Sequence, residues 1–256
     1  MIDWLSSFDE NQYVTTTKST DRVNVNVRII PAGGAARGGD WCESFALRDD
    51  LLALSIGDVC GHGPEMTEDM SALRQVIRDA ARVSVDPAQT LAEANRFLRR
   101  HDPDGTATAI FAVLDTRRRT LSFANAGHPA PLMCGPSGAI YLEYTRNDVP
   151  LGVEDEWLPL VRTVTVPAAS LLVLYTDGVN ERRSDPLGEA AKLRAAALFA
   201  YQVPSFDTAA VIEKQMFLTG VNRDDAAILT AQMPAAHVPN ERSPRAARRV
   251  LIPQVL

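Results

Sequence analysis

Four aspartates occupy positions in this sequence where a carboxylate could do chemistry. They lie beside glycine, or directly next to apolar runs that predict buried strands: Asp40, Asp58, Asp177 and Asp224. A single aspartate beside glycine is most often a turn residue, so each of them alone is weak evidence. Their shared position at the ends of apolar runs is what sets them apart from the other aspartates of the chain.

The residue types around these aspartates indicate one kind of metal chemistry. Carboxylates without histidine or cysteine at zinc spacing are hard oxygen ligands, which suit Mn²⁺ or Mg²⁺. Adjacent glycines let an ion or a backbone carbonyl come close where a Cβ would obstruct it. Two such ions about 4 Å apart would share a water, lower its pKa and present hydroxide to a phosphoryl group.

Composition and charge exclude several other classes of protein. The 256-residue chain has a formal net charge of -6, which does not favour binding to nucleic acid or to a membrane surface. The first residues lack the pattern of a signal peptide, and no apolar run is long enough to span a bilayer. Three cysteines without a CxxC pair fit a reducing compartment. We therefore expect a cytoplasmic protein.

Hydrophobic periodicity predicts an α+β fold. Alternation and short apolar runs predict strands at 23–30, 42–47, 51–56, 106–115, 120–127, 140–143, 161–166, 171–175 and 226–231. Helical spacing predicts two helices that open at Pro64 and Pro87, and two more over about 186–201 and 206–218. Strands in clusters and helices in pairs favour two sheets with a helix pair on each outer face, a four-layer α-β-β-α sandwich.

One domain accounts for most of the chain. We expect residues 1–22 to form an irregular lead-in and residues 23–236 to form the domain. Residues 237–256 carry four arginines and three prolines, which is typical of a flexible basic tail.

Seven short motifs occur in a fixed order along this domain. They are GGDW at 38–41, IGDVCGHG at 56–63, TATAIFAVLD at 106–115, ANAGHPAP at 124–131, PLG at 150–152, YTDGVNE at 175–181 and DDAAIL at 224–229. Together they resemble the SpoIIE-type branch of the metal-dependent protein phosphatases, the bacterial relatives of protein phosphatase 2C. The resemblance spans roughly residues 23–233.

The resemblance implies a fold and a set of ligands. The fold is a pair of antiparallel sheets between two pairs of helices, which agrees with the predicted order of elements. Two metal ions would be held by Asp40, Asp58, the carbonyl of Val59, Asp177 and Asp224, and the four aspartates would be the catalytic residues. All four aspartates of the family are present, so nothing in the sequence marks an inactive member.

The sequence leaves the roles of several other residues near these motifs undecided. Eukaryotic relatives carry a histidine two residues after the second aspartate, where this chain has Cys60, with His62 two residues further on. The proton donor to the leaving group is therefore His62, a water or none. We expect His128 to hold a turn, Asp225 to support its ligand neighbour, and Arg37 either to bind phosphate or to be solvated.

The function implied is hydrolysis of phosphoserine or phosphothreonine on a protein. No cysteine or serine lies in a nucleophile motif, so hydroxide would attack phosphorus directly, without a phosphoenzyme. By resemblance, the substrate is a phosphorylated regulator in a partner-switching pathway, of the STAS-type anti-sigma-factor antagonist kind. Two alternatives stay open: a binding module that sequesters a regulator without turnover, and a phosphatase for nucleotides or other small phosphoesters.

Overall fold

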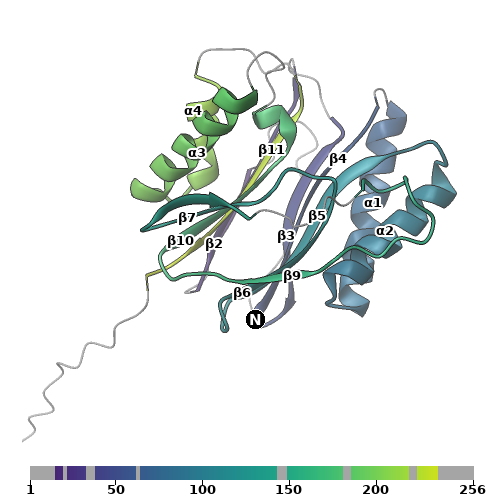
Figure 1. The fold of residues 1–256 in the computed structure, drawn as a ribbon, viewed down its shortest axis with the longest axis horizontal. Coiled ribbons are helices and arrows are strands. Elements are labelled where there is room, and N and C mark those ends of the chain that lie inside the picture. The colour runs from purple at the N-terminus through teal and green to yellow at the C-terminus, as the bar shows by residue number, and fades with distance from the viewer. Residues whose placement is uncertain are drawn as a thin grey trace, which may run out of the picture.

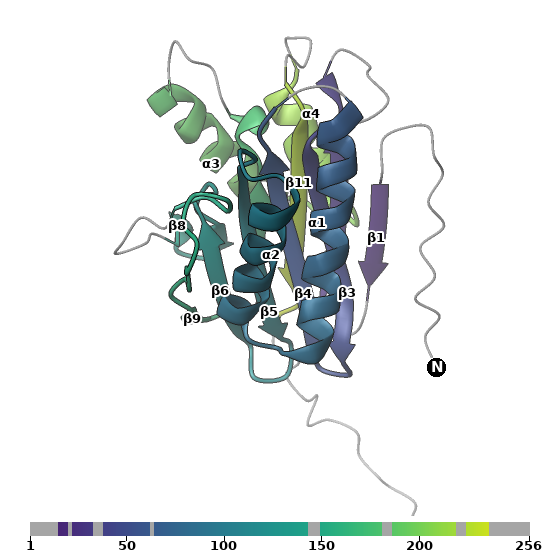
Figure 2. The same ribbon diagram turned by 90° about the vertical axis from the view of Figure 1, so that its right-hand side faces the viewer.

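The structure, a computed structural model, describes residues 15–19, 22–32, 38–61, 64–142, 149–180, 186–218 and 224–235. Two antiparallel sheets pack face to face, and a pair of helices covers the outer face of each sheet (Figures 1 and 2). This arrangement confirms the predicted four-layer α+β sandwich.

The first sheet has five strands and is built mainly from hairpins. Its order is β3-β4-β5-β6-β9, and every neighbouring pair is antiparallel. Its strands are β3 (Asp40–Arg48), β4 (Leu51–Val59), β5 (Ala107–Asp115), β6 (Thr120–Ala126) and β9 (Arg162–Thr165). The hairpins are β3-β4 and β5-β6, whereas the pairings of β4 with β5 and of β6 with β9 each join strands that are far apart along the chain.

The second sheet has six strands and combines both ends of the described chain. Its order is β1-β2-β11-β10-β7-β8, again antiparallel throughout. Its strands are β1 (Thr15–Ser19), β2 (Asn24–Ile30), β11 (Ala226–Met233), β10 (Ser170–Tyr175), β7 (Leu132–Gly135) and β8 (Gly138–Tyr141). The central position of β11, the last strand of the described residues, brings the DDAAIL motif into the middle of the sheet.

Four helices cover the two sheets. Helices α1 (Pro64–Val83) and α2 (Pro87–His101) pack on the five-stranded sheet, and α3 (Pro186–Gln202) and α4 (Thr208–Met216) pack on the six-stranded sheet. The side chain of Asp86 caps α2 by accepting a hydrogen bond from Ala88 N, where Pro87 fits the first turn. Within the described part of the chain, no helix combines the length and the apolar character that crossing a membrane requires.

Alternating side chains divide the interior into three apolar layers. Leu54 and Ile56 of β4 and Leu172 and Leu174 of β10 lie in the layer between the sheets. The residues between them face the helices instead, as Ala53 of β4 does toward α1 and α2. This period of two decides which side chains at the strand ends can meet between the sheets.

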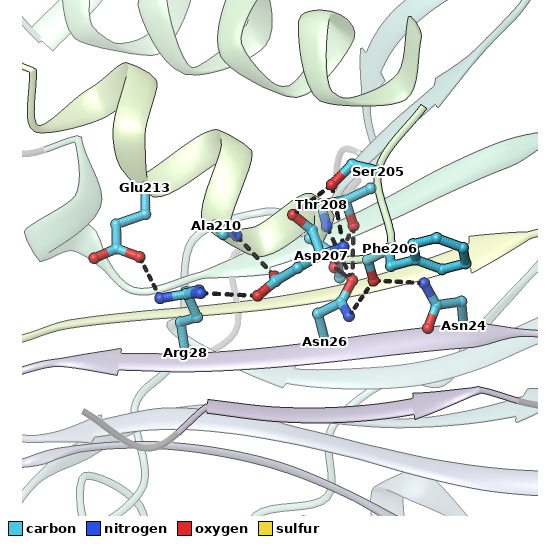
Figure 3. A network of polar contacts seen from close by, with 10 residues as sticks. Asn24, Asn26, Arg28, Ser205, Phe206, Asp207, Thr208, Ala210 and Glu213 are labelled. Carbon is cyan, nitrogen blue, oxygen red and sulfur yellow. Dashed lines mark hydrogen bonds and ion pairs between the residues drawn. The ribbon is translucent and has the colours of Figure 1, made fainter. Parts of the chain in front are cut away.

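Polar contacts fasten α4 to the six-stranded sheet (Figure 3). The guanidinium of Arg28 on β2 lies between Asp207 and Glu213, at 2.8 Å from a carboxylate oxygen of each. Two residues earlier on the same strand, Oδ1 of Asn26 accepts hydrogen bonds from the backbone N–H and from the hydroxyl group of Thr208. These residues form the Arg28 cluster, which fixes the start of α4.

The sequence missed two strands. Residues 15–19 form β1 rather than an irregular lead-in, and they pair with β2 at the edge of the sheet. Their run TTTKS has no apolar alternation, so the pairing of the backbone with β2 could not be predicted. Strand β7, with its short run LMCG, was also missed. The division into lead-in, domain and tail stays a prediction, and the tail lies outside the described residues.

Candidate metal centre

Two of the candidate aspartates face each other across neighbouring strands. Asp40 is the first residue of β3 and pairs in register with Asp58 of β4, which in turn pairs with Thr108 of β5. Residues directly opposite each other in an antiparallel sheet point to the same face. By the alternation of β4, that face is the one between the sheets, so this row of three extends the apolar layer beyond Ile56.

The other two aspartates come from the six-stranded sheet and lie at the rim. Asp177 follows β10 and begins a short 3₁₀ turn (Asp177–Val179), and Asp224 precedes β11. Both are exposed, whereas Asp40 is buried and Asp58 is half-buried. The negative charges of Asp177 and Asp224 both act on the carboxyl group of Asp58. The structure thus brings all four candidates to one end of the sandwich.

Repulsion between these carboxyl groups shows in their ionisation. Burial and the nearby charge of Asp58 raise the pKa of Asp40 well above its ordinary value. Burial also raises the pKa of Asp58, a hydrogen bond with Asp40 acts in the opposite direction, and the charges of Asp177, Asp224 and Asp225 raise it further. Anions are therefore held together here at a cost that a cation would remove.

A threonine that the sequence did not single out orients the deepest carboxylate. Thr176, at the end of β10, is fully buried and donates a hydrogen bond from Oγ1 to Oδ2 of Asp40 at 2.7 Å. Its hydroxyl oxygen accepts from the backbone N–H of Ala227 at 2.7 Å, so the direction of its own proton is fixed. The signal that could have revealed it is alternation, since Thr176 follows Leu172 and Leu174 at spacing two.

His128 lies beneath the site as a neutral side chain. The side chain of Asn125 bonds to both the N–H and the carbonyl of His128, at 2.7 and 2.8 Å, which places the histidine in a turn as expected. Its Nδ1 lies 2.8 Å from Oγ1 of Thr108, and burial lowers the pKa of the ring to about 3. It therefore supports the row that contains Asp58 and does not carry charge.

Several other residues of the motifs can be placed, and two cannot. Val59 is buried at the end of β4, where its N–H donates to the carbonyl of Gly39 at 3.2 Å. Cys60 is exposed, and its N–H donates to the carbonyl of Thr106. His62 and Arg37, the candidates for proton donor and phosphate binder, lie outside the described residues.

The residues present fit Mn²⁺ or Mg²⁺ in their chemistry. Every candidate side chain offers carboxylate oxygen, and the hydrogen bond from Thr176 leaves the other oxygen of Asp40 for a second partner. In the described ranges, no three acidic, histidine or cysteine side chains are already gathered as a finished ligand set. The ligand assignment of Asp40, Asp58, Val59, Asp177 and Asp224 therefore stays a prediction.

Comparison with known proteins identifies the family. The profile of the family Stage II sporulation protein E (SpoIIE) matches residues 48–234. The chain is 25% identical over 148 residues to the phosphoserine phosphatase RsbP of Bacillus subtilis, an alignment that covers 56% of this chain and 36% of RsbP. It is 30% identical to a crystal structure of the RsbU and RsbW domains of a Mycobacterium tuberculosis protein, with a TM-score of 0.71, covering 82% of this chain and 62% of that one.

More distant structures share the fold. RsbX in complex with magnesium is 17% identical with a TM-score of 0.68, and the catalytic domain of the serine/threonine phosphatase PstP with two manganese ions is 15% identical with a TM-score of 0.62. The matches cover 86% and 83% of this chain, and 100% and 99% of those structures. The chain spans about a third of the length of the curated relatives it matches. With a family match over most of its length and the PP2C-like sandwich in place, this chain belongs to the SpoIIE-type branch of the metal-dependent protein phosphatases.

Proposed function

We propose that this chain is a metal-dependent protein-serine/threonine phosphatase that acts on a phosphorylated regulatory protein in bacterial signalling. The observation that supports this most is the meeting of Asp40, Asp58, Asp177 and Asp224 at one end of the sandwich, from four separate stretches of sequence. Repulsion among anions weakens a fold, and function is the usual reason for keeping it.

The proposed ligands are those four carboxylates with the carbonyl of Val59, and the proposed cofactor is a pair of Mn²⁺ or Mg²⁺ ions. Such ions, when bound, would activate water for attack on phosphorus and stabilise the charge of the phosphoryl oxygens. Within the protein, Thr176 holds Asp40 in one orientation at the floor of the site. The row Asp40–Asp58 is fixed by the register of two paired strands, which makes the site rigid before any ion arrives.

Exposure of the rim favours a protein substrate. Asp177 and Asp224 are both exposed, so a phosphoserine on the surface of a second protein could approach them without entering a deep cavity. The relative RsbP is by name a phosphoserine phosphatase, and the Mycobacterium tuberculosis neighbour joins an RsbU domain to an RsbW domain. A regulator of the STAS-type anti-sigma-factor antagonist kind is the substrate we propose. A cytoplasmic location, without nucleic-acid or membrane partners, completes the proposal.

The chemistry is tested by Mn²⁺-dependent hydrolysis of p-nitrophenyl phosphate. Asp58→Asn and Asp177→Asn should each lower turnover by about 10³-fold or more, because each removes a charge from the centre. Asp79→Asn is the matched control, since Asp79 is an exposed residue of α1 and should keep wild-type turnover. Wild-type rates in the Asp58 and Asp177 variants would refute the proposed chemistry.

The substrate class needs a second measurement. Rates of phosphate release are compared for a phosphoserine protein, a phosphoserine peptide, a nucleotide and p-nitrophenyl phosphate at equal Mn²⁺. A protein phosphatase should show the highest kcat/KM on the phosphoprotein. A preference for the nucleotide would assign the small-molecule alternative instead, and tight binding of a phosphoprotein without release of phosphate would assign the binding module.

A further inference from the structure

Asp225 lies beside a proposed ligand but has different contacts. Its Oδ1 accepts a hydrogen bond from the N–H of Ala32 at 2.8 Å, and its Oδ2 accepts from the N–H of Gly39 at 3.3 Å. Ala32 follows β2 of the six-stranded sheet, and Gly39 precedes Asp40 of the five-stranded sheet. A single carboxylate therefore joins the two sheets at the end where the candidate aspartates lie.

Two glycines pack so closely against Asp225 that neither position has room for a side chain. A Cβ added to Gly38 would overlap the carboxylate of Asp225, and a Cβ added to Gly178 would overlap its backbone carbonyl. Gly178 follows Asp177, and Gly38 lies two residues before Asp40. Both turns that carry these aspartates are thus pressed against the same residue.

The neighbouring Asp224 differs on each of these points. Asp224 is exposed. Its Oδ1 accepts a hydrogen bond from the N–H of Asp225, the next residue in the same turn. The alternation of β11 explains the difference, because Asp225 has the same parity as Ala227 and Leu229, which lie between the sheets. Two adjacent aspartates therefore point in different directions and meet different partners.

We propose that Asp225 is a positioning residue, whose carboxylate holds the turn of Asp40 against the end of β2 and does not itself bind the metal. This proposal rests on the proposed function, since it assigns a task relative to the ligands named there. The two carboxylate oxygens of Asp225 already accept N–H bonds, one from Ala32 and one from Gly39, so binding an ion would compete with the bonds that keep the turn of Asp40 in place. Loss of such a supporting contact typically weakens metal affinity by about 10–100-fold.

The test compares Asp225→Asn with Asp177→Asn in the full chain. Asp225→Asn keeps the shape but replaces one accepting oxygen by an NH₂ group that faces an N–H. We expect the half-saturating Mn²⁺ concentration to rise by about 10–100-fold, with turnover recovered at saturating Mn²⁺. Asp177→Asn should stay inactive at every Mn²⁺ concentration. The amide of Gly39, followed by NMR hydrogen exchange without metal, should lose protection in Asp225→Asn and keep it in Asp177→Asn.

A substitution on the other side of the contact gives a second route. Gly38→Ala should displace the same carboxylate and raise the half-saturating Mn²⁺ concentration in the same way. Its combination with Asp225→Asn should be no worse than the more affected single variant, because both remove one contact. Gly135→Ala is the control, since a Cβ there would meet nothing within 4 Å.

Two results would overturn the proposal. Unchanged Mn²⁺ affinity in Asp225→Asn and Gly38→Ala would show that the contact has no role at the site. One fewer bound ion in Asp225→Asn by calorimetry, with no recovery at high Mn²⁺, would make Asp225 a ligand. If the wild-type chain released no phosphate, the proposed function would fail, whereas Mn²⁺ calorimetry and exchange at Gly39 would still decide the role of Asp225.

Discussion

Two polar groups lie on opposite sides of the six-stranded sheet, one toward α4 and one between the two sheets, and they differ in charge balance. On the helix side, the cation Arg28 lies between the anions Asp207 and Glu213, so each anion of the Arg28 cluster has a cationic partner (Figure 3). Between the sheets and at the rim, the group around Asp40 and Asp58 consists of carboxyl groups. The charge of Asp58 raises the pKa of Asp40, and the charges of Asp177, Asp224 and Asp225 raise the pKa of Asp58.

This difference separates a structural cluster from a functional one. A buried charge is tolerated when a partner of opposite sign and good hydrogen bonds replace its water. The Arg28 cluster meets that condition within the chain and needs nothing from outside. The aspartate group does not meet it, so its carboxyl groups stay charged together only at a cost, which a proton or a bound cation would remove.

The largest effect on stability should come from breaking the compensated cluster. Arg28→Met leaves Asp207 and Glu213 half-buried without their cation, and we expect the free energy of unfolding to fall by about 2–3 kcal/mol. Urea unfolding at neutral pH measures this change. Arg82→Met is the control, because Arg82 pairs with Asp79 on the exposed face of α1 and should cost less than about 0.5 kcal/mol.

The same variant separates structure from activity. Turnover per folded molecule should be unchanged in Arg28→Met, since Arg28 faces α4 and the candidate centre lies between the sheets. A loss of turnover at a temperature where the variant is fully folded would show that the two faces of the sheet are functionally connected. It would contradict a purely structural role for the Arg28 cluster.

Much of this architecture follows from local patterns in the sequence. Alternation and apolar runs predicted nearly all the strands, and four helices were predicted within a few residues of their observed bounds. The four candidate aspartates were found because each adjoins an apolar run or a glycine pair, which is a local signal. Strand β1 was missed because its pairing depends on the backbone of β2 and not on its own side chains.

Contacts between strands and between the two sheets could not be predicted in the same way. The direct pairing of Asp40 with Asp58 depends on the register of β3 and β4, which includes an irregularity between Ala46 and Arg48. The bond from Thr176 to Asp40 joins residues 136 positions apart. Parity along β10 shows that Thr176 faces the interior, but only the packing of one sheet on the other shows what it meets there.

Removing one anion from the group around Asp40 and Asp58 should raise the free energy of unfolding, whereas Arg28→Met should lower it. Without metal, Asp58→Asn relieves the burial of a charge and its repulsion by the rim aspartates, and we expect the free energy of unfolding to rise by about 1–2 kcal/mol. Urea unfolding in a chelator measures it, with Asp79→Asn as the control. Stability below that of wild type in chelator would contradict the idea that the group is held against its own repulsion.

His128 offers a third kind of buried polar group, one that avoids charge altogether. The ring packs against Thr108, and the backbone carbonyl of Tyr175 is its other polar neighbour. In the unfolded chain the same ring takes up a proton near pH 6.5, whereas burial keeps it neutral in the fold down to about pH 3. Between these values the unfolded state binds more protons, so the stability that His128 contributes is complete above pH 6.5 and is lost as the pH falls.

This sign predicts a specific dependence of the free energy of unfolding on pH, which is small at neutral pH and grows as the pH falls. As the pH falls from 6.5 toward 4, His128 should lower the free energy of unfolding by about 1 kcal/mol per pH unit, and His128→Gln should remove that slope because glutamine does not titrate. Urea unfolding at pH 7, 6 and 5 in chelator measures both chains. His101→Gln is the control, since about half of that side chain is exposed on α2. Parallel curves for wild type and His128→Gln would mean that the buried ring is not kept neutral, and that the floor of the aspartate group carries a cation after all.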